Sequence, residues 1–157
     1  MFGLFKSPPF SDPQLGGLRR SRGLWRGALL LHQATVPLML SGSRTAPDPE
    51  ALDIARSIAS NYSVWRATIE RALFEHYAPY AEAVIGAKQT IPSQGCRASL
   101  VRLMFGLTNA EFIQVASLDG ELIVEIGYRV VWDEEHTVGA RLWHGQLVEL
   151  CGSVLVP

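Results

Sequence analysis

Two runs of alternating apolar and polar residues flank the pair Asp119-Gly120, and this pattern constrains the fold more than any other part of the sequence. Asp-Gly is a favoured pair for a two-residue type I′ turn, which joins antiparallel strands. Residues 111–118 and 121–132 are therefore predicted to form a β-hairpin. The register counted outward from the turn pairs Leu118 with Glu121, Val115 with Val124, Gln114 with Glu125 and Ile113 with Ile126.

Further strands are expected on both sides of this hairpin. A second predicted hairpin joins residues 138–143 and 146–154 around His144-Gly145, where glycine permits the positive φ that such a turn needs. Nearer the N-terminus, three short runs are rich in strand-forming residues and predict an antiparallel meander. These runs are residues 17–22, 24–31 and 35–41.

A helix start is indicated at Asp48-Pro49-Glu50. Aspartate caps free backbone N–H groups, proline fits the first helical position, and glutamate suits the positive end of the helix dipole. Apolar residues then recur at a spacing of three or four, as on one face of a helix. We expect Asn61 to end this helix, Ser63 to cap a second one, and Pro79 to leave residues 80–85 as a separate helical turn.

The order strands, helices, strands predicts an α+β fold. We expect a largely antiparallel sheet, built from the N-terminal three-stranded meander and the two C-terminal hairpins, with two to three helices packed on one face. A length of 157 residues is typical of one domain, so residues 1–157 are expected to form a single domain, with 1–16 as an irregular lead-in. Residues 86–96 predict an exposed loop, and residues 100–105 fit either a short helix or a strand.

Composition excludes several classes of function. The formal net charge of −1 provides no overall field to attract nucleic acid or an anionic membrane. No apolar run approaches the roughly 20 residues of a membrane span, and the N-terminus lacks the apolar stretch of a signal peptide, so a cytoplasmic location is expected. Cys96 and Cys151 have no metal-type spacing, and we interpret both as reduced thiols, with a disulfide between them as the less favoured alternative.

The densest polar cluster lies between two predicted strands and has two interpretations. The candidate functional residues are Trp132, Asp133, Glu134, Glu135, His136 and Arg141. Carboxylates beside an imidazole are the groups that hold a divalent cation or transfer protons. A zinc site is disfavoured because no second histidine follows at the usual spacing, so no metal and no cofactor are expected. We favour the other interpretation, in which the acids serve a turn between strands and Trp132 belongs to the core.

Other polar residues carry weaker signals. Arg19, Arg20, Arg22 and Arg26 could bind an acidic group, but we favour a charged edge strand that resists unwanted pairing. Cys151 lies in an apolar strand and predicts a buried thiol. No nucleophile-elbow, P-loop or dinucleotide-binding motif occurs, so no catalytic residue is assigned.

The segment from Trp132 to Leu142, WDEEHTVGARL, resembles a signature of small uncharacterised bacterial proteins grouped as domains of unknown function. That signature is W-D-x-E-H-x-x-G-x-x-[FL], followed by a Gly-containing hairpin, which here spans residues 145–149. Similar segments occur in proteins proposed as immunity partners of bacterial toxins. Residues 15–18, with Trp25 and Gly27, are similar to the N-terminal strands of the same group. Thr137 departs from the pattern, which usually has glycine there.

Together these observations lead to three alternatives. The leading hypothesis is a non-enzymatic bacterial cytoplasmic protein that binds another macromolecule, as an immunity-type or regulatory partner. The second is a small-ligand binder or hydrolase-like enzyme that uses the Asp133–His136 loop, in which case Arg141 or Glu125 should converge with that loop on a concave pocket. The third is a homodimer built through an exposed sheet face.

Overall fold

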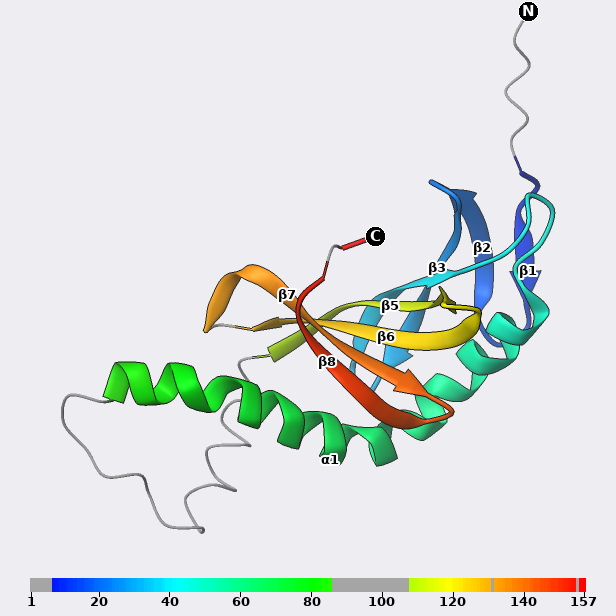
Figure 1. Ribbon diagram of the computed structural model, residues 1–157. Helices are drawn as coiled ribbons and strands as arrows, with labels where there is room; N and C mark the ends of the chain where they lie inside the picture. Colours follow the sequence, from blue (N-terminus) through cyan, green and yellow to red (C-terminus); the bar gives the residue numbers. More distant parts are fainter. Residues whose placement is uncertain (1–6, 86–107, 131, 155) are drawn as a thin grey trace, which may run out of the picture.

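The computed structural model describes residues 7–85, 108–130, 132–154 and 156–157. Within these residues the chain forms one eight-stranded sheet and one long helix (Figure 1). The expected loop at 86–96, the segment 100–105 and Cys96 lie outside the described residues.

The strands follow one another across the sheet in chain order, from β1 to β8. Their bounds are β1 Phe10–Asp12, β2 Gly16–Ser21, β3 Leu24–Leu31, β4 Ala34–Leu40, β5 Thr108–Leu118, β6 Glu121–Val130, β7 Asp133–Trp143 and β8 Gln146–Val154. Neighbouring strands pair antiparallel, except that β4 and β5 pair parallel. The helix α1 (Pro49–Ile85) lies between β4 and β5 in the chain, as a parallel pair requires a long crossover connection.

The register of the β5–β6 hairpin is confirmed. Leu118 pairs with Glu121, and the three further pairs expected from the turn are also present. Asp119 and Gly120 have φ of 52° and 91°, which are the positive values that a type I′ turn requires. Local turn chemistry and alternation therefore determine this part of the sheet.

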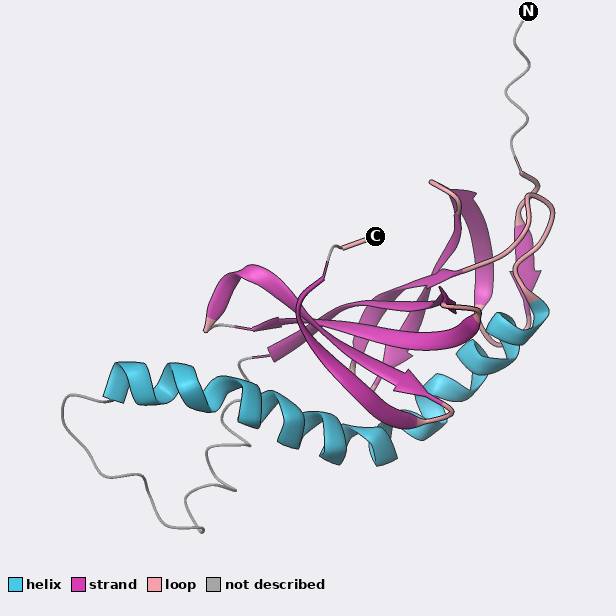
Figure 2. Cartoon of the chain, viewed as in Figure 1, coloured by secondary structure: helices cyan, strands magenta, loops and turns pink. Residues whose placement is uncertain are grey.

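The prediction of two to three helices is wrong, because α1 is a single helix of 37 residues (Figure 2). It starts where expected: the backbone N–H of Glu50 donates to Asp48 Oδ1 over 2.9 Å. Neither Asn61 nor Ser63 ends it, because the buried face continues through both positions on the spacing of three and four. Pro79 is also accommodated within the helix. The buried apolar side chains of α1 include Ala55, Ile58, Tyr62, Trp65, Ile69 and Leu73.

Two further boundaries differ from the sequence prediction. β1 lies within the stretch 1–16 that was expected to be irregular, and it pairs with the first residues of β2. Residues 133–137 were expected to be a connection, but they form the start of β7, where Asp133 pairs with Val130 and Thr137 with Arg129. A register shift between these pairs marks an irregularity at the bend.

The main core lies between α1 and one face of the sheet. It contains Trp25, Leu38, Ile113, Ile126 and Ala140, together with the buried face of the helix. The N-terminal half of α1 is also held by an ion pair: Arg56 Nη2 lies 2.6 Å from Oδ2 of the buried Asp12 in β1. Asp12 Oδ1 accepts the backbone N–H groups of Gln14 and Leu15, so both carboxylate oxygens are occupied.

The opposite face of the sheet buries a smaller apolar group. Phe112 and Met39 are 0% and 2% exposed, yet neither belongs to the main core cluster. Strand alternation places them on the face away from α1, since their neighbours Ile113 and Leu38 face the main core. The Phe112 ring lies over Gly127 of β6, which has no side chain to displace it.

Candidate functional site

A cavity of about 430 Å³ lies where the N-terminal half of α1 meets the turns of two hairpins. We call it the tryptophan cavity. Its wall includes Glu50 and Trp65 from α1, Glu121 and Leu122 from the start of β6, and Trp143 and His144 from the end of the β7–β8 hairpin. Volumes of 300–1,000 Å³ are typical of small-ligand pockets. Three segments that are far apart in the sequence therefore build one concave surface.

The second hairpin turn is fixed against the helix. His144 and Gly145 have φ of 47° and 76°, as the turn requires. A Cβ on Gly145 would lie 3.2 Å from Trp65 Nε1, so the turn backbone packs close to this indole. The packing leaves Trp65 only 9% exposed, whereas Trp143 at the rim is 41% exposed. The Trp143 and His144 rings are neighbours, with centroids 4.6 Å apart.

The lining of the tryptophan cavity contains two carboxylates, besides the polar side chains of Ser57, Asn61 and His144. Glu50 and Glu121 are both exposed, and among the described residues neither forms an ion pair. Ser57 also lines the cavity, but its hydroxyl donates to the Ile54 carbonyl over 2.7 Å. The Ser57 hydroxyl therefore donates its proton within the helix. It is not hydrogen-bonded to His144, as a serine nucleophile would be to its general base.

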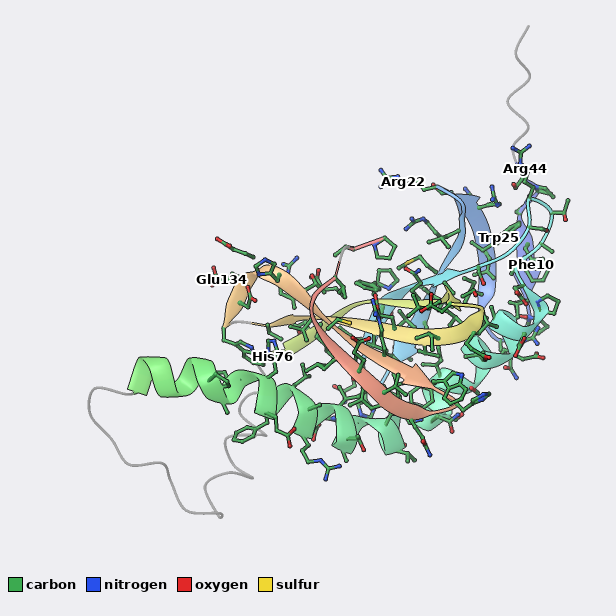
Figure 3. All side chains as sticks on the ribbon, in the orientation of Figure 1. Phe10, Arg22, Trp25, Arg44, His76 and Glu134 are labelled. Carbon is green, nitrogen blue, oxygen red and sulfur yellow. The ribbon has the colours of Figure 1, made fainter. Side chains whose placement is uncertain are left out.

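The Trp132–His136 residues are divided between two neighbourhoods, and none of them lines the tryptophan cavity. Trp132 packs against α1: its indole N–H donates to His76 Nδ1 over 3.3 Å, and its ring centroid lies 5.0 Å from that of Tyr77. On the start of β7, Asp133 Oδ1 lies 2.8 Å from His136 Nδ1. Glu134 and Glu135 are exposed, and Figure 3 shows Glu134 at the outer end of the bend, beyond His76.

Arg141 does not join this group. It pairs with Glu125 of β6 and Glu149 of β8, at 2.6 Å and 3.0 Å, in a row across three neighbouring strands. The hydrogen bond to Glu125 raises the pKa of Arg141, which therefore stays charged and neutralised within the sheet. Arg141 and His136 are close in sequence but do not form one site, because the Glu125–Arg141–Glu149 row lies further along β7 than His136.

Two arginines of the N-terminal strands, Arg20 and Arg26, donate to backbone oxygens of described residues. Arg20 donates to the Gly23 carbonyl over 3.4 Å, and Arg26 Nη1 donates to the Pro157 carbonyl over 3.1 Å. Arg22 occupies the turn between β2 and β3 with a φ of 51°. Figure 3 shows Arg22 and Arg44 well away from Glu134.

Other expectations concern metals, thiols and membranes. In the described part of the chain, no group of three or more His, Cys, Asp or Glu side chains is arranged to hold a metal ion. Cys151 is a partly buried free thiol, and burial raises its pKa. No described helix combines the length and apolar character that crossing a bilayer demands.

Sequence reasoning did not find the tryptophan cavity. It assigned Glu50 to the helix start and Trp143 to a strand, and both local assignments hold. One feature of the sequence could have pointed to the cavity. Trp143 directly precedes an exposed hairpin turn, a position where a core residue is unusual. Within the described residues the fold is an eight-stranded, mostly antiparallel sheet with a single helix on one face. No protein-family model, curated protein or solved structure matches the chain.

Proposed function

We propose that this is a non-enzymatic bacterial cytoplasmic protein that binds a protein partner, and that the tryptophan cavity is its binding surface. One observation carries the proposal: a tryptophan that is 41% exposed stands at the rim of a 430 Å³ cavity. Tryptophan is enriched among the few residues that supply most of the binding energy in protein interfaces. Such a side chain buries a large area when a partner covers it.

The internal pairing of other polar groups supports binding rather than catalysis. Glu125, Arg141 and Glu149 satisfy one another within the sheet. Asp12 and Arg56 join β1 to α1. These groups stabilise the fold, and their charges are already compensated. An active site instead needs groups held ready for a substrate.

The resemblance of residues 132–142 to a bacterial signature bears on the kind of partner. Similar segments occur in proteins proposed as toxin-immunity partners, so an immunity-type or regulatory role agrees with a binding function. The fold alone would not decide this, because one architecture can serve many functions.

The test is capture of a partner by two matched variants. Trp143→Ala removes the exposed indole, whereas Leu30→Ala removes an apolar side chain that is 59% exposed on β3, away from the cavity lining. We expect the wild-type protein and Leu30→Ala to retain the same protein from a bacterial lysate, and Trp143→Ala to lose it. Both variants should keep the wild-type circular dichroism spectrum. Equal capture by all three proteins would contradict a binding role for the cavity.

A second candidate function rests on the Asp133–His136 pair. A carboxylate 2.8 Å from Nδ1 orients an imidazole in the way that a general base requires. A hydrolase-like enzyme or small-ligand binder would use this pair. The described residues place neither Glu125 nor Arg141 beside it, and no described hydroxyl or thiol hydrogen-bonds to His136. Hydrolysis of a panel of ester and amide substrates that is lost in His136→Ala would favour this candidate over the binding role.

A homodimer is the remaining alternative, and it is decided by mass in solution. Light scattering at several protein concentrations distinguishes a monomer from a self-associating chain. If a dimer forms and Trp143→Ala dissociates it, the partner that covers the cavity is a second copy of the chain.

A further inference from the structure

We propose that the tryptophan cavity recognises a cationic side chain, an arginine of the protein partner. This inference rests on the proposed binding function and adds the chemistry of the group that enters the cavity. It draws on three features: the charge of the wall, its aromatic surface, and the distribution of charge along the chain.

The wall carries two carboxylates and no described lysine or arginine. Glu50 comes from the first turn of α1 and Glu121 from the first residue of β6, so the two approach the cavity from different elements. The helix N-terminus contributes only about +0.5 of an elementary charge. Asp48, which accepts the Glu50 N–H, already lies against that positive end. With His144 of the wall neutral, two full negative charges exceed the dipole, and the cavity favours a cation.

The aromatic surface favours a particular kind of cation. A guanidinium is planar and weakly hydrated, so it stacks on an indole and can still donate hydrogen bonds to carboxylates in its own plane. Tryptophan is the best aromatic partner for such a cation, and the contact strengthens binding by about two- to fivefold at an exposed site. Trp143 at the rim offers this surface, and Leu122 can contact the methylene groups of the same side chain.

The charges of the chain are segregated, although the net charge is only −1. Residues 108–157 contain eight Asp and Glu against two Arg, whereas residues 7–47 contain one Asp and five Arg. The two hairpins that build one side of the cavity thus belong to the acidic part of the chain. Most of these acids lie elsewhere or are paired, as Glu125 and Glu149 are with Arg141. Glu50 and Glu121 line the cavity without an ion pair among the described residues, and they favour a cationic surface over an acidic one.

The test uses n-butylguanidinium as the probe and n-butylurea as a neutral control of nearly the same shape. The ¹⁵N-labelled protein is titrated with each at constant ionic strength, which keeps screening equal. We expect saturable shifts of the indole N–H signals of Trp65 and Trp143, with those of Trp25 and Trp132 unchanged. The guanidinium should bind at least about fivefold more tightly than the urea, since only the cation gains from the carboxylates.

A pair of variants separates a local charge effect from a general one. Glu121→Gln removes one carboxylate of the wall, and Glu134→Gln removes an exposed carboxylate on β7 that does not line the cavity. Glu121→Gln should weaken n-butylguanidinium about two- to fivefold and leave n-butylurea unaffected, because one ion pair at a partly exposed site is lost. Glu134→Gln should change neither affinity.

Several outcomes would overturn the inference. Equal affinity for both probes would mean that the cavity selects apolar shape, and equal effects of the two glutamine variants would mean that only overall charge acts. If Trp143→Ala abolishes partner capture while n-butylguanidinium fails to bind, the binding function survives and the arginine inference fails. If n-butylguanidinium binds as expected while Trp143→Ala still captures its partner, the cation preference stands and the protein-binding role of the cavity fails.

Discussion

The contact between Phe112 and Gly127 provides the sharpest test of the packing on the sheet face away from α1. A Cβ added to Gly127 would lie 2.6 Å from Cδ1 and Cζ of Phe112, and closer still to Cε1. Gly127 has no positive φ, so the substitution Gly127→Ala introduces no backbone strain. Overpacking of this kind costs about 1–3 kcal/mol, and the lower entropy of the unfolded chain returns about 0.4–1 kcal/mol. We expect a net destabilisation between about 0 and 2.6 kcal/mol, or roughly 1.3 kcal/mol at the midpoints of the two ranges.

A second background isolates the ring as the cause. In a Phe112→Ala protein the obstruction is gone, so Gly127→Ala should become neutral or stabilising by about 0.4–1 kcal/mol. Phe112→Ala itself is expected to cost about 3–5 kcal/mol, since a buried ring leaves a cavity. Phe112→Leu provides a milder background if the alanine protein is only marginally folded. If the effect of Gly127→Ala on stability changes sign between the wild-type and Phe112→Ala backgrounds, the cost arises from direct contact with the ring.

The assay is urea denaturation followed by circular dichroism, with free energies compared at equal m-values. The control is Gly17→Ala in β2, another strand glycine without a positive φ, where an added Cβ meets nothing within 4 Å. It should leave stability unchanged or slightly increased. An equal cost of Gly127→Ala with and without the Phe112 ring would refute the reasoning.

Three further predictions concern titratable groups. Hydrogen bonds from Arg56 lower the pKa of Asp12 from 3.8 to about 2. The ionised Asp12 carboxylate therefore adds about 2 kcal/mol to the free energy of unfolding. This stabilisation is complete above pH 3.8 and is lost as the pH falls through about 2. The stability difference between wild type and Asp12→Asn should shrink over that interval in denaturation series. Tyr128→Phe should cost about 1 kcal/mol in the same assay, because the buried hydroxyl of Tyr62, 3.1 Å away, loses its partner. In a Cys96→Ser background, Cys151 should react with a disulfide reagent more slowly than a free thiol at neutral pH, since burial raises its pKa.

Elements encoded by neighbouring residues were predictable from the sequence. The start of α1 follows from Asp48-Pro49-Glu50, whose capping group acts on an N–H two residues away. The β5–β6 register follows from Asp119-Gly120, because a two-residue turn leaves only one pairing that keeps the apolar alternation on one face. In both cases the determining contacts span only a few residues.

The length of α1 was not predictable in this way. Asn61 and Ser63 resemble helix-terminating residues, but their local preference amounts to a few tenths of a kcal/mol to about 1 kcal/mol. The continuous burial of Tyr62, Trp65 and Ile69 against the sheet outweighs it, since each fully buried apolar side chain contributes about 1.5–3 kcal/mol. Sequence propensity could not show this, because the opposing surface belongs to strands far away in the chain.

The candidate site shows the same division between local and tertiary information. The sequence by itself determined the two hairpin turns and the helix start, whose residues later form the wall of the tryptophan cavity. Only the tertiary structure brings Glu50, Glu121 and Trp143 together. The helix connects the parallel strands β4 and β5, and it lines the cavity together with the ends of both hairpins. The tertiary structure also keeps Arg141 apart from His136, because Glu125 of β6 and Glu149 of β8 form ion pairs with this arginine. Local pattern is set by contacts within a few residues, whereas a site depends on which distant surfaces the packed chain brings together.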